Sequence, residues 1–302
     1  MNRTLIASLV LAGAMLASCS DSPQQAQKEK QTTTQKQKPT SSKKTGNNAS
    51  KEAKIERNDT SSDWQRDGIF THSNFSGETY THKHYSLSYS EADEQAEWVA
   101  YELTKNESQG VEERADLFSE DPIIKTGSAK PYEYRNSGYD KGHLAPSADM
   151  RFDEEAMAEC FYMSNVSPQT NDMNAGIWND LEKKTRSWAR YYGRVYVICG
   201  PVLNIPEKQK KKLQYDDKYK GKTTTNITIP EYFYKIVFDF SKKGKEKMIA
   251  FCIPNKATSK SYRDYAVSVD SIEKMTNLDF FTNLPLDVQA KYESSFDIDK
   301  WK

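Results

Sequence analysis

Apolar side chains recur along this chain with two different periods, which predict both strands and helices. Strands are indicated where apolar and polar residues alternate, or where turn residues bound a short apolar run. Five segments have these features: residues 85–89, 96–103, 195–199, 232–239 and 247–253. The last two flank a polar stretch that contains Gly244, which is typical of a hairpin. The strand pattern therefore favours an antiparallel sheet.

A second set of segments has helical spacing. In residues 173–192, five side chains fall on one face of a predicted helix: Trp178, Leu181, Thr185, Trp188 and Tyr192. Residues 153–160 predict a short helix, and residues 269–275 predict the start of a last one. Antiparallel strands combined with separate helices predict an α+β fold, with a central antiparallel sheet and flanking helices.

The N-terminus has the features of an export signal. Arg3 precedes the apolar run 5–16, which is too short to span a bilayer, so residues 1–18 are predicted to be a signal peptide. The sequence Leu16-Ala17-Ser18-Cys19 resembles a bacterial lipobox. It implies lipidation of Cys19 and an exported lipoprotein, anchored on the periplasmic or cell-surface face of a membrane. The alternative is an ordinary secretory signal followed by an unmodified cysteine; we favour lipidation.

Composition divides the rest of the chain into a linker and a domain. Residues 19–62 are polar, almost without large apolar side chains, and are predicted to be a disordered linker. Their nine Lys/Arg against five Asp/Glu could hold polyanions near the domain, but we favour a simple tether. Residues 63–302 form one domain, long enough for a substantial core. It holds 33 basic and 38 acidic residues, so binding a polyanion requires a local concentration of cations.

Residues 138–182 carry the candidate chemistry. His143 is one of only four histidines, and Gly142 before it lets the backbone bend sharply. Pro146 ends any strand ladder beyond it. We expect a histidine on such a bend to keep one ring face open while the backbone fixes its other nitrogen. It would be neutral near pH 7 and able to take a proton from water. A purely structural histidine is the alternative.

Asn174 and Glu182 indicate a hydrated cation near this histidine. Asn174 lies where the helix 173–192 begins, so it is either an N-cap or an amide-oxygen ligand of a divalent cation such as Mg²⁺. Glu182 lies about 12 Å further along a helix axis, on roughly the same side. This distance favours contact through bridging water over shared direct ligation. The alternative for Glu182 is an exposed helix residue that pairs with Arg186.

Several separated blocks of the sequence resemble one known family. Asp140-Lys141-Gly142-His143 resembles the Asp-Arg-Gly-His signature of the DNA/RNA non-specific endonucleases, which are ββα-metal, or His-Me finger, nucleases. Ser164-Asn165-x-x-Pro168-Gln169 and Asn174-x-Gly176-x-Trp178-x-x-Leu181-Glu182 follow at the family's spacing. Residues 200–201 and 272–281 match further downstream. The resemblance implies a ββα-metal active site within the α+β fold.

The resemblance also implies roles for individual residues. His143 would be the general base. Asn174 would be the one protein ligand of Mg²⁺, and Glu182 would hold the water molecules that complete the ion's shell. Asn165 would help shape the catalytic site, and Arg114 would add a second positive charge there.

Lys141 departs from the family, which usually has arginine at this position. Arginine grips a phosphate with two parallel hydrogen bonds, whereas lysine offers a point charge. We therefore expect charge stabilisation to survive with less control of geometry. Arg135 and Arg186 are further candidates for substrate binding, and the alternative for each is an ordinary surface residue.

The first hypothesis is a Mg²⁺-dependent, sugar-non-specific endonuclease that hydrolyses phosphodiester bonds in DNA and RNA. Mn²⁺ fits the same ligands, and contacts made mainly to phosphate make recognition largely independent of sequence. The second hypothesis is a lipid-anchored nucleic-acid-binding protein of the same fold with weak or no turnover. Lys141 and the acidic domain motivate it. The sequence leaves the oligomeric state open.

Overall fold

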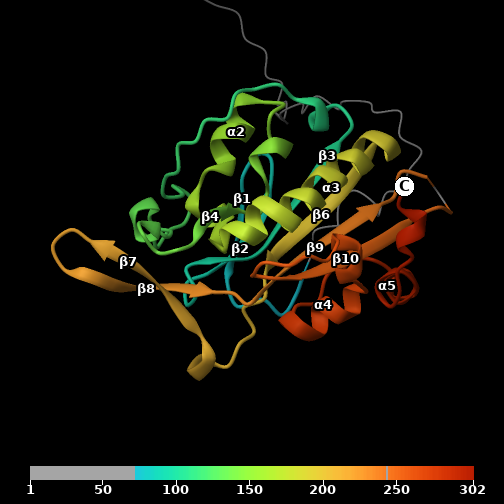
Figure 1. The fold of residues 1–302 in the computed structure, drawn as a ribbon. Coiled ribbons are helices and arrows are strands. Elements are labelled where there is room, and N and C mark those ends of the chain that lie inside the picture. The colour runs from blue at the N-terminus through green and yellow to red at the C-terminus, as the bar shows by residue number, and fades with distance from the viewer. Residues whose placement is uncertain (1–71, 243) are drawn as a thin grey trace, which may run out of the picture. The chain divides into compact units, whose positions relative to one another are not determined.

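The computed structural model describes residues 72–242 and 244–302, and its centre is a seven-stranded sheet (Figure 1). The strands lie in the order β1-β2-β3-β6-β9-β10-β11, and all neighbours are antiparallel. Their bounds, in that order, are Glu78–Thr81, Ser86–Ser90, Gln95–Thr104, Arg194–Pro201, Tyr232–Asp239, Lys247–Pro254 and Ala266–Val267. The predicted α+β class with a central antiparallel sheet is confirmed.

Both faces of this sheet are buried, which explains its apolar strands. In β9, Phe233 and Val237 belong to one hydrophobic cluster, whereas Tyr234, Ile236 and Phe238 belong to the other. Successive side chains of a strand point to opposite faces, so a strand between two clusters has no solvent-facing side.

Helices cover both faces of the sheet (Figure 1). In the described residues the α-helices are α2 (Glu154–Cys160), α3 (Asn179–Tyr192), α4 (Val269–Thr276) and α5 (Leu286–Glu293). Short 3₁₀ helices join the elements: η1 (Glu107–Gln109), η2 (Pro131–Tyr134), η3 (Ser147–Asp149), η4 (Met163–Asn165), η6 (Glu207–Gln209), η7 (Tyr262–Tyr265) and η8 (Ile298–Lys300). Trp188 of α3 packs into one cluster and Ile272 of α4 into the other. Asp153 and Ser268 cap α2 and α4 with their side-chain oxygens.

The main departures from the predicted elements lie in three places. Residues 173–192 are not one regular helix: a π-helix, η5 (Met173–Trp178), precedes α3, and Gly176 inside it leaves helical geometry with φ −94° and ψ −112°. The prediction missed β7 (Lys211–Asp217), β8 (Gly221–Ile229) and α5. These elements carry few apolar side chains, so their periodicity is weak.

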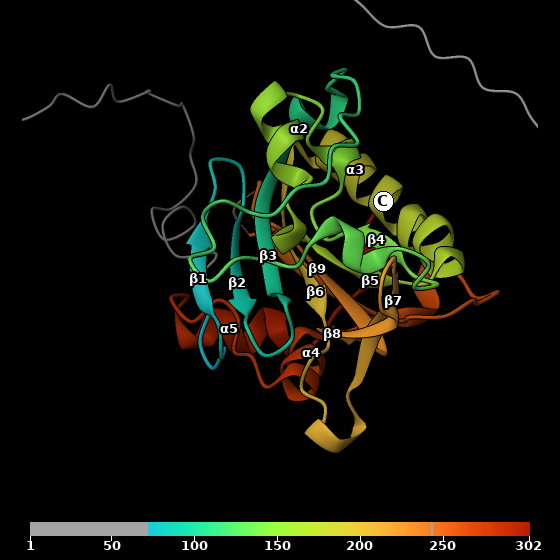
Figure 2. The same cartoon turned by 90° about the vertical axis from the view of Figure 1, so that its left-hand side faces the viewer.

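Two antiparallel pairs lie outside the main sheet. β4 (Asp140–His143) pairs with β5 (Val166–Gln169), and β7 pairs with β8. Val166 shares a hydrophobic cluster with Leu213 of β7 and Ile227 of β8. Figure 2 shows both pairs on the same side of the domain. We call the β7–β8 pair the arm, because it extends away from the main sheet (Figure 1).

Several sequence-based expectations concern the N-terminal part of the chain. The predicted signal peptide, Cys19, the linker 19–62 and the domain boundary at residue 63 lie outside the described residues. In the described part, no helix has the length and apolar character needed to cross a membrane. Cys160, Cys199 and Cys252 are all free, so the one disulfide that their number allowed is not formed.

Candidate active site

The β4–β5 ribbon holds His143 at the end of β4. His143 lies opposite Val166 in the register, and Gly142 lies opposite Ser167. A Cβ atom at Gly142 would lie 2.2 Å from the side chain of Gln169, which is fully buried. The glycine before the histidine is therefore required by close packing.

Asn165 fixes the chain that follows His143. Its Oδ1 accepts a hydrogen bond from the backbone N–H of Ala145 at 2.9 Å. Its Nδ2 donates to the carbonyl oxygens of Ala145 and Cys160, at 2.9 and 2.8 Å. Because these partners are all backbone groups and the side chain is fully buried, Asn165 acts on the site by positioning the loop after β4.

The His143 ring is buried between two aromatic rings. Its centroid lies 5.2 Å from that of Phe118 and 4.9 Å from that of Phe161. Burial, and then the positive charges of Arg114 and Lys141, lower the pKa of His143 to about 3. The imidazole is therefore neutral at pH 7 and can accept a proton. Among the described residues the buried Nε2 has no hydrogen-bond partner, and aromatic packing holds the ring where a backbone hydrogen bond was expected.

Asn174 is oriented by a carboxylate of the histidine motif. It lies in the first turn of η5 and is not the N-cap, which is Asp172, so that alternative is wrong. Its Nδ2 donates to Asp140 Oδ2 at 2.9 Å, and Asn171 Nδ2 donates to the same oxygen at 3.0 Å. Since a carboxylate can only accept here, the amide oxygen of Asn174 faces away from Asp140. The sequence did not predict this role for Asp140.

Asn174 borders a cleft of about 710 Å³ that also contains basic residues. Lys141, Arg114 and Arg135 line the same cleft. The Nζ of Lys141 lies 4.3 Å from the centroid of the Phe118 ring. The cleft therefore joins an amide oxygen to three cations, two of which act on the neighbouring histidine.

His143 lies beside this cleft and does not line it. Its contact partner Phe118 is part of the lining, so the imidazole packs against the wall of the cleft. Arg114 is held over the Phe161 ring, at 5.1 Å, and its Nη1 donates to Ser147 Oγ at 2.8 Å. The two aromatic residues thus position both the imidazole and the cations next to it.

Arg186 was predicted to bind substrate, but it belongs to a buried polar group. Its Nη1 donates to Asp149 Oδ1 at 2.6 Å, and the Tyr101 hydroxyl donates to Asp149 Oδ2 at 2.7 Å. The Arg186 side chain is only 13% exposed and that of Asp149 only 1%. Arg186 is thus committed to Asp149, neither to the cleft nor to an ion pair with Glu182.

Glu182 is next to the same group. Burial raises its pKa to about 7, against the opposing effect of several charges, of which Lys235 is the strongest. Lys235 lies within β9, is fully buried, and has its Nζ 4.8 Å from the centroid of the Trp178 ring. The sequence analysis missed Lys235, although a single lysine inside the apolar strand 232–239 is a signal of a buried charge.

The comparison with protein families agrees with this geometry. The model of the family described as DNA/RNA non-specific endonuclease matches residues 65–287. The chain belongs to the DNA/RNA non-specific endonuclease family. In this family member, β4 and β5 followed by η5 and α3 form the expected ββα unit.

Known members of the family and a solved structure are similar over much of the domain. Mitochondrial nuclease EXOG of Xenopus laevis is 34% identical over 68% of this chain, and a nuclease of Nostoc sp. is 33% identical over 70%. These matches cover 59% and 76% of the two relatives, so the chain spans little more than half of the EXOG protein. A chain in the crystal structure of the EndoG/EndoGI complex matches with a TM-score of 0.58 and 26% identity, covering 68% of this chain and 86% of that chain.

The donors of the ββα unit fit a hard divalent cation. Asp140 turns the amide oxygen of Asn174 away from itself, and Glu182 supplies a carboxylate eight residues further on. Amide and carboxylate oxygens suit Mg²⁺ and Mn²⁺, which keep several water molecules when bound. The ββα unit of this endonuclease-family chain therefore carries oxygen donors of the kind that such a cation takes.

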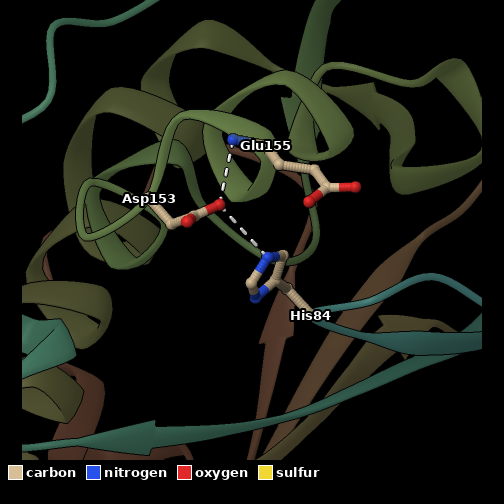
Figure 3. A group of neighbouring side chains, drawn as sticks. All are labelled: His84, Asp153 and Glu155. Atoms are coloured by element: carbon tan, nitrogen blue, oxygen red, sulfur yellow. Dashed lines mark hydrogen bonds and ion pairs between the residues drawn. The ribbon is translucent and has the colours of Figure 1, made fainter.

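A second group of possible ligands lies outside the ββα unit (Figure 3). His84, Asp153 and Glu155 each offer a donor atom within 4.8 Å of the others. Asp153 Oδ1 lies 3.3 Å from His84 Nε2 and accepts the backbone N–H of Glu155 at 3.0 Å. Glu155 forms an ion pair with Lys83. Helix capping and ion pairing account for these contacts, so we assign no metal there.

Proposed function

We propose that this chain is a metal-dependent, sugar-non-specific endonuclease that hydrolyses phosphodiester bonds in DNA and RNA. One observation carries the proposal: the oriented amide oxygen of Asn174 and the ammonium of Lys141 share a cleft next to the neutral His143. Membership in the endonuclease family supports the same activity. Three cations, Arg114, Arg135 and Lys141, line the cleft beside the carboxylate of Asp140, and they suit the phosphates that DNA and RNA share.

The metal site of the proposal uses three residues of this chain. Asn174 Oδ1 would hold Mg²⁺, or Mn²⁺, and Glu182 would accept hydrogen bonds from water molecules around the ion. When bound, the ion supplies positive charge to the phosphate oxygens. Asp140 keeps the amide oxygen in place by accepting the Nδ2 hydrogen bond.

The protein groups around the phosphate then have separate tasks. His143 takes a proton from the water that attacks phosphorus, which its neutral form at pH 7 and its unpaired nitrogen allow. As the new P–O bond forms, the P–O bond to the leaving strand breaks, and the leaving oxygen takes a proton from solvent. Lys141 and Arg114 bind phosphate oxygens and stabilise the charge that develops on them. Lys141 does so as a point charge, so that orientation of the phosphate depends more on Arg114 and Asn174.

The substitution His143→Ala tests the catalytic role. We expect it to lower Mg²⁺-dependent plasmid nicking by at least about 100-fold while circular dichroism stays unchanged, because it removes the group that accepts the proton of the attacking water. His84→Ala removes a histidine outside the cleft and serves as the matched control. Undiminished nicking by His143→Ala would refute the assignment. Retarded but uncut nucleic acid with the unsubstituted chain and Mg²⁺ would indicate a binding protein.

We also propose that the protein is anchored to a membrane through Cys19. The lipobox-like sequence 16–19 and the polar linker after it support this location. Cys19→Ser should move the protein from the membrane fraction to the soluble fraction and abolish labelling by a radioactive fatty acid, because it removes the thiol that is acylated. Persistent labelling of the Cys19→Ser variant would rule out this anchor.

A further inference from the structure

The turn at the end of the arm presents a cationic and aromatic surface. We define the arm tip as Lys218, Tyr219 and Lys220, which lie between β7 and β8, together with Lys222 of β8. All four side chains are exposed, and Tyr219 is 87% exposed. Residues 218–222 contain three lysines and no acid in a domain with more acidic than basic residues. The arm tip is therefore a local concentration of positive charge.

The backbone of the arm tip is well defined. Asp217 Oδ1 accepts the backbone N–H groups of Tyr219 and Lys220 at 2.8 and 2.9 Å. Gly221 has φ +73°, a left-handed conformation that glycine adopts without strain. The side chains of the arm tip are thus carried by an ordered turn, in which the Nζ of Lys218 lies 5.4 Å from the centroid of the Tyr219 ring.

The arm contacts the wall of the catalytic cleft close to its tip. Tyr132 and Arg135 line the cleft. The ring of Tyr132 lies 5.6 Å from that of Tyr215, and the backbone N–H of Asp216 donates to the carbonyl of Arg135 at 3.1 Å. A strand rises about 3.3 Å per residue, so Lys218 follows within about 7 Å of this contact. The cations of the cleft and those of the arm tip are therefore neighbours.

The base of the arm is fixed to the ribbon that carries the histidine. Leu213 and Ile227 pack with Val166 of β5 and Tyr134 of η2 in one buried cluster. The Nζ of Lys210, just before β7, lies 2.8 Å from Asp93 Oδ1. Packing at the base and hydrogen bonding near the tip hold the arm in a fixed position relative to the cleft.

We infer that the arm tip is a second contact for the nucleic-acid strand, outside the catalytic cleft. The lysines of the tip bind backbone phosphates that flank the one being cleaved, and Tyr219 stacks on an unpaired base. Tyr132, 45% exposed at the cleft wall, offers a second ring on the same path. This inference rests on the proposed nuclease function and adds single-stranded segments as the preferred substrate.

The experiment compares two arm-tip variants of the full chain with matched controls. The first variant, Lys218→Ser/Lys220→Ser/Lys222→Ser, is compared with Lys242→Ser/Lys245→Ser in the exposed β9–β10 turn. The second variant, Tyr219→Ala, is compared with Tyr191→Ala, whose tyrosine is 61% exposed on α3. Binding of a fluorescent 30-nucleotide DNA strand, with EDTA to prevent cleavage, is measured from 50 to 300 mM salt. We expect the lysine variant to bind about tenfold more weakly. Its slope of log Kd against log salt should fall by about 2, as expected for three lost phosphate contacts.

The Tyr219→Ala variant should lose about tenfold in affinity without a change in salt slope, because stacking releases no counterions. With Mg²⁺, the loss of kcat/KM in both variants should grow with substrate length between 4 and 30 nucleotides. Affinity and slope equal to those of the controls would overturn the inference. Binding that depends on the arm tip in a chain that never cleaves would refute the nuclease function and leave the inference standing.

Discussion

At the scale of single residues, Lys235 and Glu182 show how a buried charge can change the pKa of a residue in the site. Lys235 is fully buried in β9, and its positive charge opposes the rise in the pKa of Glu182 that burial causes. Asp149 raises the same pKa, whereas Arg186 and Arg114 lower it. In the proposed mechanism Glu182 must be ionised to hold water on the cation, so this balance sets the acid side of the activity profile.

The substitution Lys235→Met tests this balance. Removing the strongest opposing charge raises the pKa of Glu182 above about 7, so the acidic limb of kcat/KM against pH should move upward by about one unit. The profile is measured between pH 5 and 9 at saturating Mg²⁺. Lys274→Met, an exposed lysine on α4, is the control and should leave the limb in place. A folded Lys235→Met variant with an unshifted limb would contradict the role.

At the scale of elements, the β4–β5 ribbon and the hydrogen bonds of Asn165 hold the residues of the site in position. Asn165 makes three hydrogen bonds to backbone groups, one of which reaches the end of α2 at Cys160. Gly142 allows β4 to lie against Gln169. The ribbon therefore depends on contacts between side chain and backbone that tolerate no other residue type.

We expect Asn165→Ala to lower the free energy of unfolding by about 2–4 kcal/mol, because it leaves buried backbone groups without partners. It should also lower kcat/KM by more than tenfold at temperatures where the variant is folded, since the loop after His143 loses its anchor. Urea denaturation and plasmid nicking measure the two effects. Asn226→Ala, at an exposed position of β8, should change neither; a loss of stability without loss of activity would show that Asn165 serves folding alone.

At the scale of the whole molecule, two glutamates, the half-buried Glu273 and the buried Glu293, make stability depend on pH. Burial raises the pKa of Glu273 to about 7, and Asp279 and Asp270 raise it further. Burial raises the pKa of Glu293 to about 8, and the charges of Glu273, Asp270 and Asp279 add to this rise. The folded state therefore keeps protons that the unfolded state releases above about pH 4.5. Because the unfolded state binds fewer protons in this range, stability falls as pH rises from about 4.5 to about 8.

The substitution Glu293→Gln tests this dependence. The two pKa shifts set an upper limit of about 6 kcal/mol on the loss of stability of the original chain between pH 5 and pH 8.5, and solvent screening at the half-buried Glu273 lowers it. We expect the variant to lose roughly half or more of this difference. Unfolding by urea at both pH values measures it. Asp287→Asn, an exposed position in the first turn of α5, is the control. Equal pH dependence in the original chain and in Glu293→Gln would exclude the carboxyl pair as its cause.

The distribution of charge is also a property of the whole molecule. The domain is acidic in sum, yet Lys141, Arg114 and Arg135 line one cleft, and the strand before the arm tip contacts the wall of this cleft. Net charge alone therefore gave little indication of a nucleic-acid substrate. The tertiary arrangement concentrates the cations at one side, where they act over a short distance.

Local patterns in the sequence were enough for most of the elements and for the motif blocks of the family. Alternation and apolar runs predicted β3, β6, β9 and β10 within two residues, because each period reflects contacts along a single element. The spacing of His143, Asn174 and Glu182 indicated the chemistry, since the ββα unit is contiguous in the chain.

Only the tertiary structure decided how these residues are oriented and what supports them. Asp140 turns the amide of Asn174, Asp149 takes Arg186 away from the substrate surface, and Lys235 acts on Glu182 from another strand. Each of these pairs is separated by tens of residues and meets because the sheet, η5 and α3 pack together. Periodicity cannot reveal such contacts, because burial and charge depend on which distant segments enclose a side chain.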